Sequence, residues 1–353
     1  MALKITTMRK HIQIPLFILL FWVLISCQPR KELRVMQFNI WQEGTQVENG
    51  FQGIVDNIIS LNPDLVTFSE VRNYNGVSFI PRLLSTLEQR GVHYYGKESV
   101  STGIISKYEI ESHDIVYPLD NDRGSVIKDI IKVGKGGVAL YSAHLDWLNC
   151  SSYLPRGYDG CTWEKLPSPI SDVDSILFDN RQSFRDDEVK AIIRDAKKEI
   201  NLGRAVIIGG DFNEPSHLDW QDDTKDMRGH NGLVIDWDCS TLLANEGYVD
   251  TFREKHPDAV RYPGFTFPAN NEYADLKKLC WSPDADDRER IDFIYYKPNR
   301  SLSLKNVSII GPSGCIFYGK RTDKDSDGDD SFIQPSGTWP TDHKALMADF
   351  SIK

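Results

Sequence analysis

The chain has 353 residues, of which 40% are hydrophobic and 26% are charged, and its formal net charge is -10. This composition is typical of a globular protein, and the length suits one large α/β domain or two small ones. The acidic balance argues against a protein that holds nucleic acid mainly by neutralising phosphates, although a local cationic or metal-bearing cleft can outweigh the mean charge.

The first 27 residues have the layout of an export signal. Lys4, Arg9 and Lys10 precede the apolar run IPLFILLFWVLIS, which ends at Cys27. The run is shorter than the roughly 18 residues of a membrane-spanning helix. LISC resembles a bacterial lipobox, so residues 1–27 are predicted to be a lipoprotein signal peptide with Cys27 as the lipidated residue; an uncleaved anchor is the alternative. In either case we expect the body to be tethered to a membrane, on the periplasmic or cell-surface side of a bacterial envelope.

Five further cysteines follow in what is then an oxidising compartment. Because their number is odd, at least one thiol is free or bonds to another chain. Cys150 and Cys161 bracket a short loop and are the best candidates for a disulfide. None of the five has the spacing of a zinc site.

Strand and helix patterns alternate from about residue 32 onward. Helical spacing predicts amphipathic helices over residues 51–63, 78–91 and 183–203, and residues 247–257 read as a helix or turn. Residues 149–180 have no regular pattern. Alternating apolar positions predict strands at residues 33–41, 64–71, 102–107, 129–134, 137–147, 205–213, 290–297 and 345–353.

These elements contain no interdomain linker and no repeat, so residues 32–353 are predicted to form one domain. The strands alternate in polarity and are not continuously apolar. Such strands favour largely antiparallel sheets that pack on each other with helices outside.

Groups that bind cations or move protons stand at the ends of several predicted strands. A single Asp or Asn at a strand end is ordinary turn chemistry. Turn chemistry does not require Glu and His at so many strand ends, so we expect these groups to form one site. They are Asn39, Glu70, His144, Asp211, Asn213, Arg290, Asp292, Asp342 and His343.

Oxygen ligands are prominent in this set. Glu70, with Asn39 and Asp342 nearby, would suit Mg²⁺, or alternatively Mn²⁺, better than zinc. The metal would polarise a phosphoryl oxygen and stabilise negative charge on a leaving group.

The other side chains fit proton transfer. His343 paired with Asp292 would be an oriented base or charge stabiliser. Asp211 would orient or deprotonate an attacking water, and Asn213 would donate to a phosphoryl oxygen. His144 would be a second proton-transfer group, and which histidine protonates the leaving group stays open. Together these roles amount to metal-assisted hydrolysis of a phosphoester.

The ordered series FNIW, FSEV, SAHLD, GGDFN, RIDF and TDH resembles the endonuclease/exonuclease/phosphatase superfamily from about residue 33 to the C-terminus. The resemblance implies an α/β fold, a four-layer αββα sandwich of two mixed, largely antiparallel sheets with outer helices. It also implies Mg²⁺ dependence and direct attack by water. By position, Asn39 and Glu70 would hold the metal, and His144 would match a catalytic histidine of the nuclease and sphingomyelinase branches.

Members of the superfamily use the same kind of site on very different substrates, so the fold does not identify the substrate. Trp147, Tyr153, Tyr158 and Trp163 follow His144 and would form an aromatic wall for a sugar, base or lipid headgroup; the alternative is a loop that packs on itself. Arg123 and Arg156 are candidate phosphate contacts.

The expected function is therefore an exported phosphodiesterase or phosphatase that acts on a small or headgroup-like substrate. No stable nucleic-acid complex is expected, and the oligomeric state stays open. An exported deoxyribonuclease-like enzyme is the first alternative. A surface lipoprotein that binds glycan or another ligand without catalysis is the second, although such a binder has no reason to keep the whole polar set.

One acidic segment lies before the final strand. Asp323, Asp325 and Asp327 have the spacing that opens a calcium loop, and Gly328 follows them. The twelfth position is Gln334 instead of Glu, so a solvated acidic loop is the preferred interpretation and Ca²⁺ the alternative.

Overall fold

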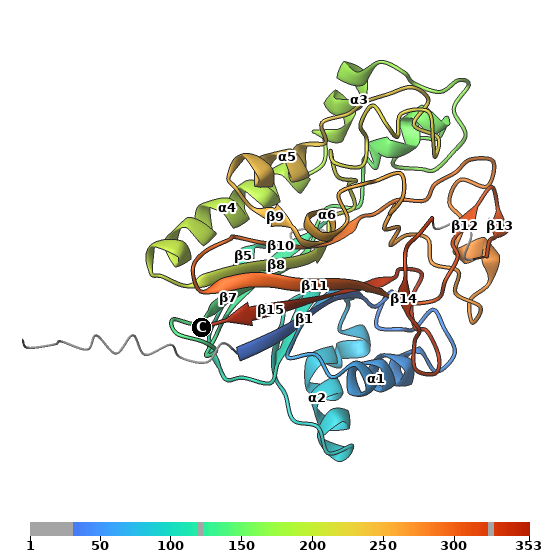
Figure 1. Cartoon of the computed structure of the whole chain (residues 1–353). Coiled ribbons are helices and arrows are strands. Elements are labelled where there is room, and N and C mark those ends of the chain that lie inside the picture. Colours follow the sequence, from blue (N-terminus) through green and yellow to red (C-terminus); the bar gives the residue numbers. More distant parts are fainter. Residues whose placement is uncertain (1–30, 119–122, 324–327) are drawn as a thin grey trace, which may run out of the picture.

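The computed structural model describes residues 31–118, 123–323 and 328–353 (Figure 1). The predicted signal peptide with Cys27 lies outside the described residues, as do Asp325 and Asp327 of the candidate calcium loop. No helix in the described ranges is long and apolar enough to cross a membrane.

Two large sheets form the centre of the molecule (Figure 1). The seven-stranded sheet has, in spatial order, β14 (Phe332–Ile333), β11 (Leu302–Ile310), β15 (Ala345–Ile352), β1 (Lys31–Asn39), β2 (Leu65–Val71), β4 (Ser101–Ser106) and β3 (Tyr95–Glu98). The six-stranded sheet has β5 (Ile110–Tyr117), β6 (Ser125–Ile131), β7 (Val138–His144), β8 (Ala205–Asp211), β10 (Asp292–Tyr296) and β9 (Val249–Asp250). A small hairpin is made by β12 (Ile316–Phe317) and β13 (Lys320–Arg321).

Helices cover the outer face of each sheet, so the predicted four-layer αββα sandwich is confirmed (Figure 1). The helices α1 (Gly50–Leu61) and α2 (Phe79–Gln89) pack on the seven-stranded sheet. The helices α4 (Arg185–Asn201) and α5 (Asp238–Asn245) pack on the six-stranded sheet. The shorter elements are α3 (Val173–Asn180), α6 (Thr251–Lys255), η1 (Tyr74–Gly76), η2 (Ser151–Arg156) and η3 (Leu276–Lys278).

Three apolar clusters correspond to the three interfaces between these layers. The cluster between the sheets includes Val35, Leu140, Ile207 and Leu346, and one cluster lies under each helix layer. The central strands β7 and β8 are therefore buried along their whole length instead of half-buried as expected. All three clusters draw on strands or helices from both halves of the described chain, which agrees with the predicted single domain of residues 32–353 without testing whether it folds alone.

Close packing explains why glycines occupy positions 209 and 210, just before Asp211. A Cβ at Gly209 would lie 2.2 Å from Thr67 Oγ1 of the facing sheet, and a Cβ at Gly210 would lie 2.5 Å from the carbonyl oxygen of Ala143. Only glycine permits this close approach. Gly209 therefore lets the facing sheet approach β8 closely, and Gly210 lets β7 do so, just before the polar end of β8.

The predicted strands and the long helices are present, but some elements were missed. The edge strands β3 and β5 and the strand β11 were not predicted, nor were α3 and α5. In β11 a register shift between Leu304 and Asn306 interrupts the alternation on which the sequence pattern depends.

The predicted disulfide between Cys150 and Cys161 is absent, because both residues are free thiols in the structure. The Cys150 thiol donates to the carbonyl oxygen of Trp147 at 3.1 Å. The loop between the two cysteines is closed by the backbone instead, where Cys150 N donates to Gly160 O at 2.9 Å.

Candidate active site

The strand directions bring the predicted polar residues to one edge of the sandwich. The central pairs β1–β2 and β7–β8 are parallel, whereas β15 and β10 run antiparallel to their neighbours. The last residues of the four parallel strands therefore meet the first residues of β10 and β15. Asn39, Glu70, His144, Asp211, Asp292, Asp342 and His343 all lie at or beside these six strand ends.

The pairing of strands in the six-stranded sheet places three of these residues side by side. His144 on β7 is paired with Asp211 on β8, and Asp211 is paired with Asp292 on β10. His144 Nε2 lies 3.9 Å from Asp211 Oδ2. Since the pairing depends only on backbone ladders, the geometry of this row follows directly from the fold.

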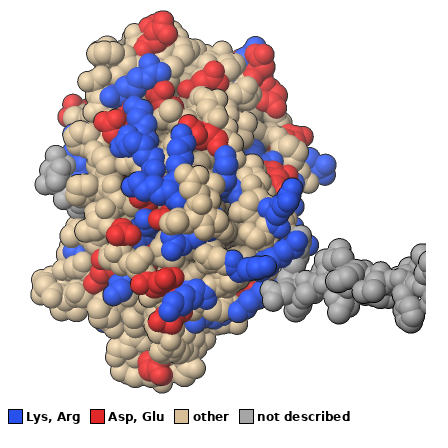
Figure 2. Space-filling model, turned by 90° about the vertical axis from the view of Figure 1, so that its left-hand side faces the viewer, with Lys and Arg blue, Asp and Glu red and all other residues tan. Residues whose placement is uncertain are grey.

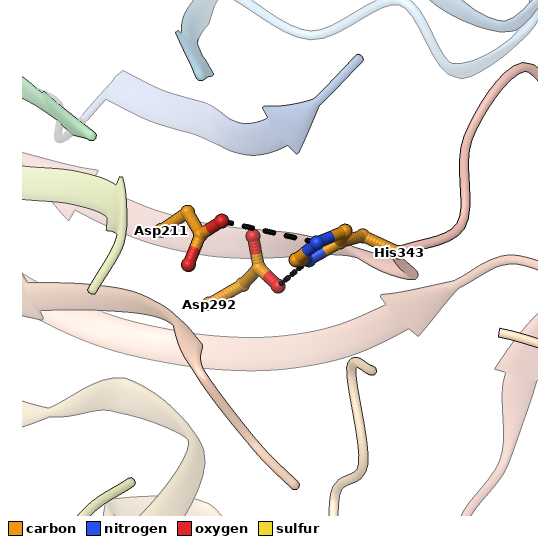
Figure 3. A group of neighbouring side chains, drawn as sticks. All are labelled: Asp211, Asp292 and His343. Atoms are coloured by element: carbon orange, nitrogen blue, oxygen red, sulfur yellow. Dashed lines mark hydrogen bonds and ion pairs between the residues drawn. The ribbon is translucent and has the colours of Figure 1, made fainter. Parts of the chain in front are cut away.

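His343 completes the row from the opposite sheet (Figure 3). Its Nδ1 lies 2.8 Å from Asp292 Oδ2, and its Nε2 lies 3.8 Å from Asp211 Oδ2. Burial alone would lower the pKa of His343, but the carboxylates of Asp292 and Asp211 outweigh burial and raise that pKa well above its usual value. The predicted His343–Asp292 pair is therefore present in the structure.

Asn39 and Glu70 belong to the seven-stranded sheet and lie next to Asp211 of the six-stranded sheet. Asn39 Nδ2 donates to Asp211 Oδ2 at 2.8 Å and to Glu70 Oε1 at 3.1 Å. Glu70 lies in a β-bulge between Ser69 and Val71 and has a left-handed φ of 69°. Bulges redirect side chains at the edges of sheets, and here the bulge turns Glu70 towards the other carboxylates.

The carboxylates crowd one another in a buried place. Burial, and then repulsion by Asp292, raises the pKa of Asp211 to about 7. Burial also raises the pKa of Asp342 to about 7, although the nearby His343 opposes this rise and Glu70 adds to it. Asp292 Oδ1 is buried and receives no hydrogen bond from any residue that the structure describes.

A divalent metal fits this donor set. The atoms that Asp211, Asp292 and His343 offer lie within 4.8 Å of one another. The unpaired Asp292 Oδ1 and the crowded, buried carboxylates of Asp211 and Asp342 are groups that a divalent cation beside them would stabilise. Carboxylate and amide oxygens are typical ligands of Mg²⁺.

His144 differs from His343 in its surroundings. Its Nδ1 lies 2.5 Å from Ser101 Oγ, and both residues are buried. Burial, with help from Arg72 and His343, lowers the pKa of His144 well below its usual value. Its surroundings therefore favour the neutral form of His144, whereas the carboxylates around His343 favour its charged form.

Ser101 and Arg72 were not predicted as parts of the site. Arg72 lines the cavity and lies 3.9 Å from Glu70 Oε2, and its Nη1 donates to Ser101 Oγ at 3.3 Å. Ser101 has a left-handed φ of 79° at the start of β4. No sequence pattern marks either residue, because their partners are far away in the chain.

A cavity of about 300 Å³ opens over these residues. Trp147, Tyr153 and Trp163 of the predicted aromatic wall line it, and Trp281 joins them. The rings of Trp147 and Trp163 are nearly parallel at 9° with centroids 5.9 Å apart, and Trp281 lies 4.4 Å from Trp163. The segment that follows His144 and the loop that contains Trp281 thus contribute to one aromatic wall.

Tyr158 and Arg123, which were predicted to contact the substrate, bind other residues of the protein. Tyr158 is buried outside the cavity lining, where its hydroxyl accepts from Asp284 N at 3.1 Å. Arg123 pairs with Asp146 at 2.5 Å and lies over the Phe184 ring. Neither residue lines the cavity.

Three more predicted residues, Arg156, Arg290 and Asn213, bind to carboxylates or backbone of the protein itself. Arg156 is buried and pairs with Glu289 at 2.6 Å, so it is not a surface phosphate contact. Arg290 bridges the carboxylates of Asp219 and Asp250 away from the site. Asn213 does line the cavity, and its Nδ2 donates to the carbonyl oxygen of Leu145 at 3.0 Å.

The sequence of residues 36–343 matches the Endonuclease/Exonuclease/phosphatase family. The chain belongs to this family. A relative in Caenorhabditis elegans, the uncharacterized protein F14F9.5, is 30% identical over 335 residues, which is 91% of each chain. Members of the family hydrolyse phosphoesters.

Solved structures of low sequence identity share the fold. D. rerio TDP2 complexed with a single-strand DNA product has a TM-score of 0.51 at 14% identity, covering 90% of this chain and 98% of that one. The human Nocturnin catalytic domain with bound sulfate also has a TM-score of 0.51 at 14% identity, covering 92% and 100%. At these identities the likeness concerns the fold alone.

Proposed function

We propose that this protein is an exported, metal-dependent phosphoesterase that hydrolyses a phosphodiester or phosphomonoester of a small or headgroup-like substrate by direct attack of water. The observation that carries the proposal is the convergence of Asn39, Glu70, Asp211, Asp292 and His343, of which Glu70, Asp211 and His343 line one cavity. Carboxylates, a carboxamide and an oriented histidine in contact are the components that metal-assisted hydrolysis needs.

Mg²⁺, or Mn²⁺, would be held by Glu70 and Asn39 with Asp342 beside them. When bound, the metal would polarise the phosphoryl oxygen and stabilise charge on the leaving group. The carboxamide of Asn39 already connects Glu70 to Asp211, so the metal ligands and the carboxylate that would activate water are held together by one side chain.

The chain's own residues divide the remaining roles. Asp211 Oδ2 is positioned to orient and deprotonate water, because its Oδ1 is held by the Asn213 backbone at 2.9 Å. Asp292 fixes Nδ1 of His343 and leaves Nε2 directed towards Asp211, where it would stabilise negative charge on the phosphoryl group. Ser101 orients His144 through Nδ1, which leaves Nε2 towards the same point.

Cavity size and lining favour a compact substrate. A volume of about 300 Å³ lies at the small end of ligand pockets, and three indole rings form one side of it. A flat or ring-shaped group attached to the phosphate would stack on this wall. Export and lipid attachment at Cys27 are part of the proposal on the strength of the sequence pattern alone.

A substrate panel tests the proposal. The domain of residues 31–353 is assayed with Mg²⁺ or with EDTA on bis-p-nitrophenyl phosphate, p-nitrophenyl phosphate, sphingomyelin, inositol phosphates and plasmid DNA. We expect metal-dependent turnover of a small ester that His343→Ala abolishes. Plasmid nicking above all other activities would favour the nuclease alternative, and no turnover by folded protein would favour the ligand-binding alternative.

A further inference from the structure

Positively charged side chains gather at the edge of the sandwich opposite the candidate site. The site occupies the last residues of β1, β2, β7 and β8, so the opposite edge holds the first residues of these strands and the last residues of β6, β10 and β15. The basic residues at this edge are Lys31, Arg34, Lys107, Lys132, Lys135, Arg204, Lys297, Arg300, Lys305 and Lys353. We call this set the basic face.

Backbone contacts place these residues side by side although they are far apart in the sequence. Lys31 pairs with Ile352 in the sheet, Lys135 N donates to Lys353 O at 2.6 Å, and Lys353 N donates to Ser301 O at 3.0 Å. Figure 2 looks onto this side of the molecule and shows Lys and Arg side chains gathered across it.

Many of these charges are not neutralised within the described parts of the chain. Four members pair with carboxylates, including Arg34 with Asp349 at 3.0 Å and Lys132 with Glu109 at 3.1 Å. The exposed Lys135, Arg300 and Lys305 form no ion pair with a described carboxylate. The carboxylates among these residues are the partners Asp64, Glu109, Glu199 and Asp349, together with the exposed Glu32, and Figure 2 shows acidic side chains interspersed with the basic ones. In a chain with a net charge of -10, this concentration of positive charge marks a surface for an anionic partner.

We propose that the basic face docks on an anionic membrane surface and holds the candidate site away from that membrane. Cys27, the predicted lipidation site, precedes Lys31 by four residues, which reach at most about 14 Å. A lipid there would keep the basic face within reach of phospholipid headgroups, where Lys and Arg residues contribute to binding. The docking itself does not depend on the proposed function. Only its consequence for the substrate rests on that function.

That consequence follows from the length of β1, which runs from the basic face to the site. Its nine residues, Lys31 to Asn39, span about 26 Å at the usual rise of a strand. Lipids of the docked membrane are therefore out of reach of Asp211 and His343, and the substrate arrives from the solution on the far side. A nucleic acid bound to the basic face would be equally far from the site, which is why we favour a membrane.

Vesicle binding by the domain of residues 31–353 tests the docking surface without any turnover. Vesicles of phosphatidylcholine alone are compared with vesicles that also contain phosphatidylglycerol, at low and at high salt. We expect binding only to the anionic vesicles, and weaker binding as salt rises. The variant K135Q/R300Q/K305Q should bind them on the order of 100-fold more weakly.

The matched control removes three exposed lysines at the other end of the molecule, as K277Q/K278Q/K320Q, and should bind anionic vesicles like the wild type. Equal binding to neutral and anionic vesicles, or an equal loss in both triple variants, would overturn the proposal. Tighter binding to duplex DNA, lost in K135Q/R300Q/K305Q, would replace the membrane by nucleic acid. Hydrolysis of a soluble ester by both variants should equal that of the wild type, so an inactive wild type would count against the proposed function and not against docking.

Discussion

Replacing Asp292 by Asn keeps the size of the side chain and removes the charge that holds His343. In the wild type, Asp292 Oδ2 lies 2.8 Å from His343 Nδ1 and both side chains are buried. An Asn at position 292 would not stabilise the protonated ring, and its amide would place a hydrogen-bond donor against Nδ1. Loss of an orienting carboxylate behind a histidine costs on the order of 10³- to 10⁴-fold in kcat, or about 4 to 5.5 kcal/mol.

The assay measures p-nitrophenol release from bis-p-nitrophenyl phosphate at saturating Mg²⁺. Asp284→Asn is the matched control, because it makes the same change at an exposed carboxylate that pairs with Lys165. The control should retain its activity, since exposed ion pairs contribute little to stability. If Asp292→Asn unfolds at the same temperature as the wild type and its kcat falls by less than about tenfold, the role given to the pair is wrong.

Three further predictions concern the metal, the aromatic wall and the pH dependence of stability. Glu70→Gln should raise the Mg²⁺ concentration needed for half-maximal activity by at least about tenfold, measured by Mg²⁺ titration. Trp281→Ala removes a ring 4.4 Å from Trp163 and should raise KM by about tenfold with little change in kcat, measured by steady-state kinetics. His230 stacks on Trp220 at 3.7 Å, and burial, with the charge of Arg156, lowers its pKa to about 2. Because the folded state keeps this ring neutral, its contribution to the free energy of unfolding is present above about pH 6.5 and is lost towards lower pH, by about 2 kcal/mol at pH 5. Urea unfolding at pH 7 and pH 5 should show that His230→Phe removes this loss.

Each of these predictions has an outcome that contradicts it. An unchanged Mg²⁺ requirement in Glu70→Gln would remove this residue from the metal site. A fall in kcat with unchanged KM in Trp281→Ala would indicate a role other than substrate binding. An equal pH dependence of unfolding in wild type and His230→Phe would assign the acid sensitivity to other groups.

Much of the site could be predicted because its residues stand at strand ends. Asp211, Asp292 and His144 each follow or begin an apolar run, and strand pairing then aligns them without help from loops. Ser101 and Arg72 could not be found in the same way. Their roles depend on contacts with His144 and Glu70 across the fold, and neither belongs to a pattern within its own segment.

The substrate side was harder to predict for a related reason. Arg123 and Arg156 have the residue type of phosphate contacts, but their charges are taken up by Asp146 and Glu289. Tyr158 has the residue type of an aromatic wall, but packing with Tyr153 and Ala285 buries it. Loop residues of a suitable type become ligand contacts only where the loop leaves them facing the cavity, and loop conformation is not encoded by periodicity.

The most direct test of the central claim compares wild type and Asp211→Asn for p-nitrophenol release from bis-p-nitrophenyl phosphate, each with Mg²⁺ and with EDTA. The carboxylate is buried between Asn39, His343 and Asp292, so the variant removes the group that would activate water and keeps its shape. We predict Mg²⁺-dependent release by the wild type and a loss on the order of 10³-fold in the variant. Equal release by the two folded proteins, or release that EDTA does not affect, would contradict a metal-assisted phosphoesterase site at these residues.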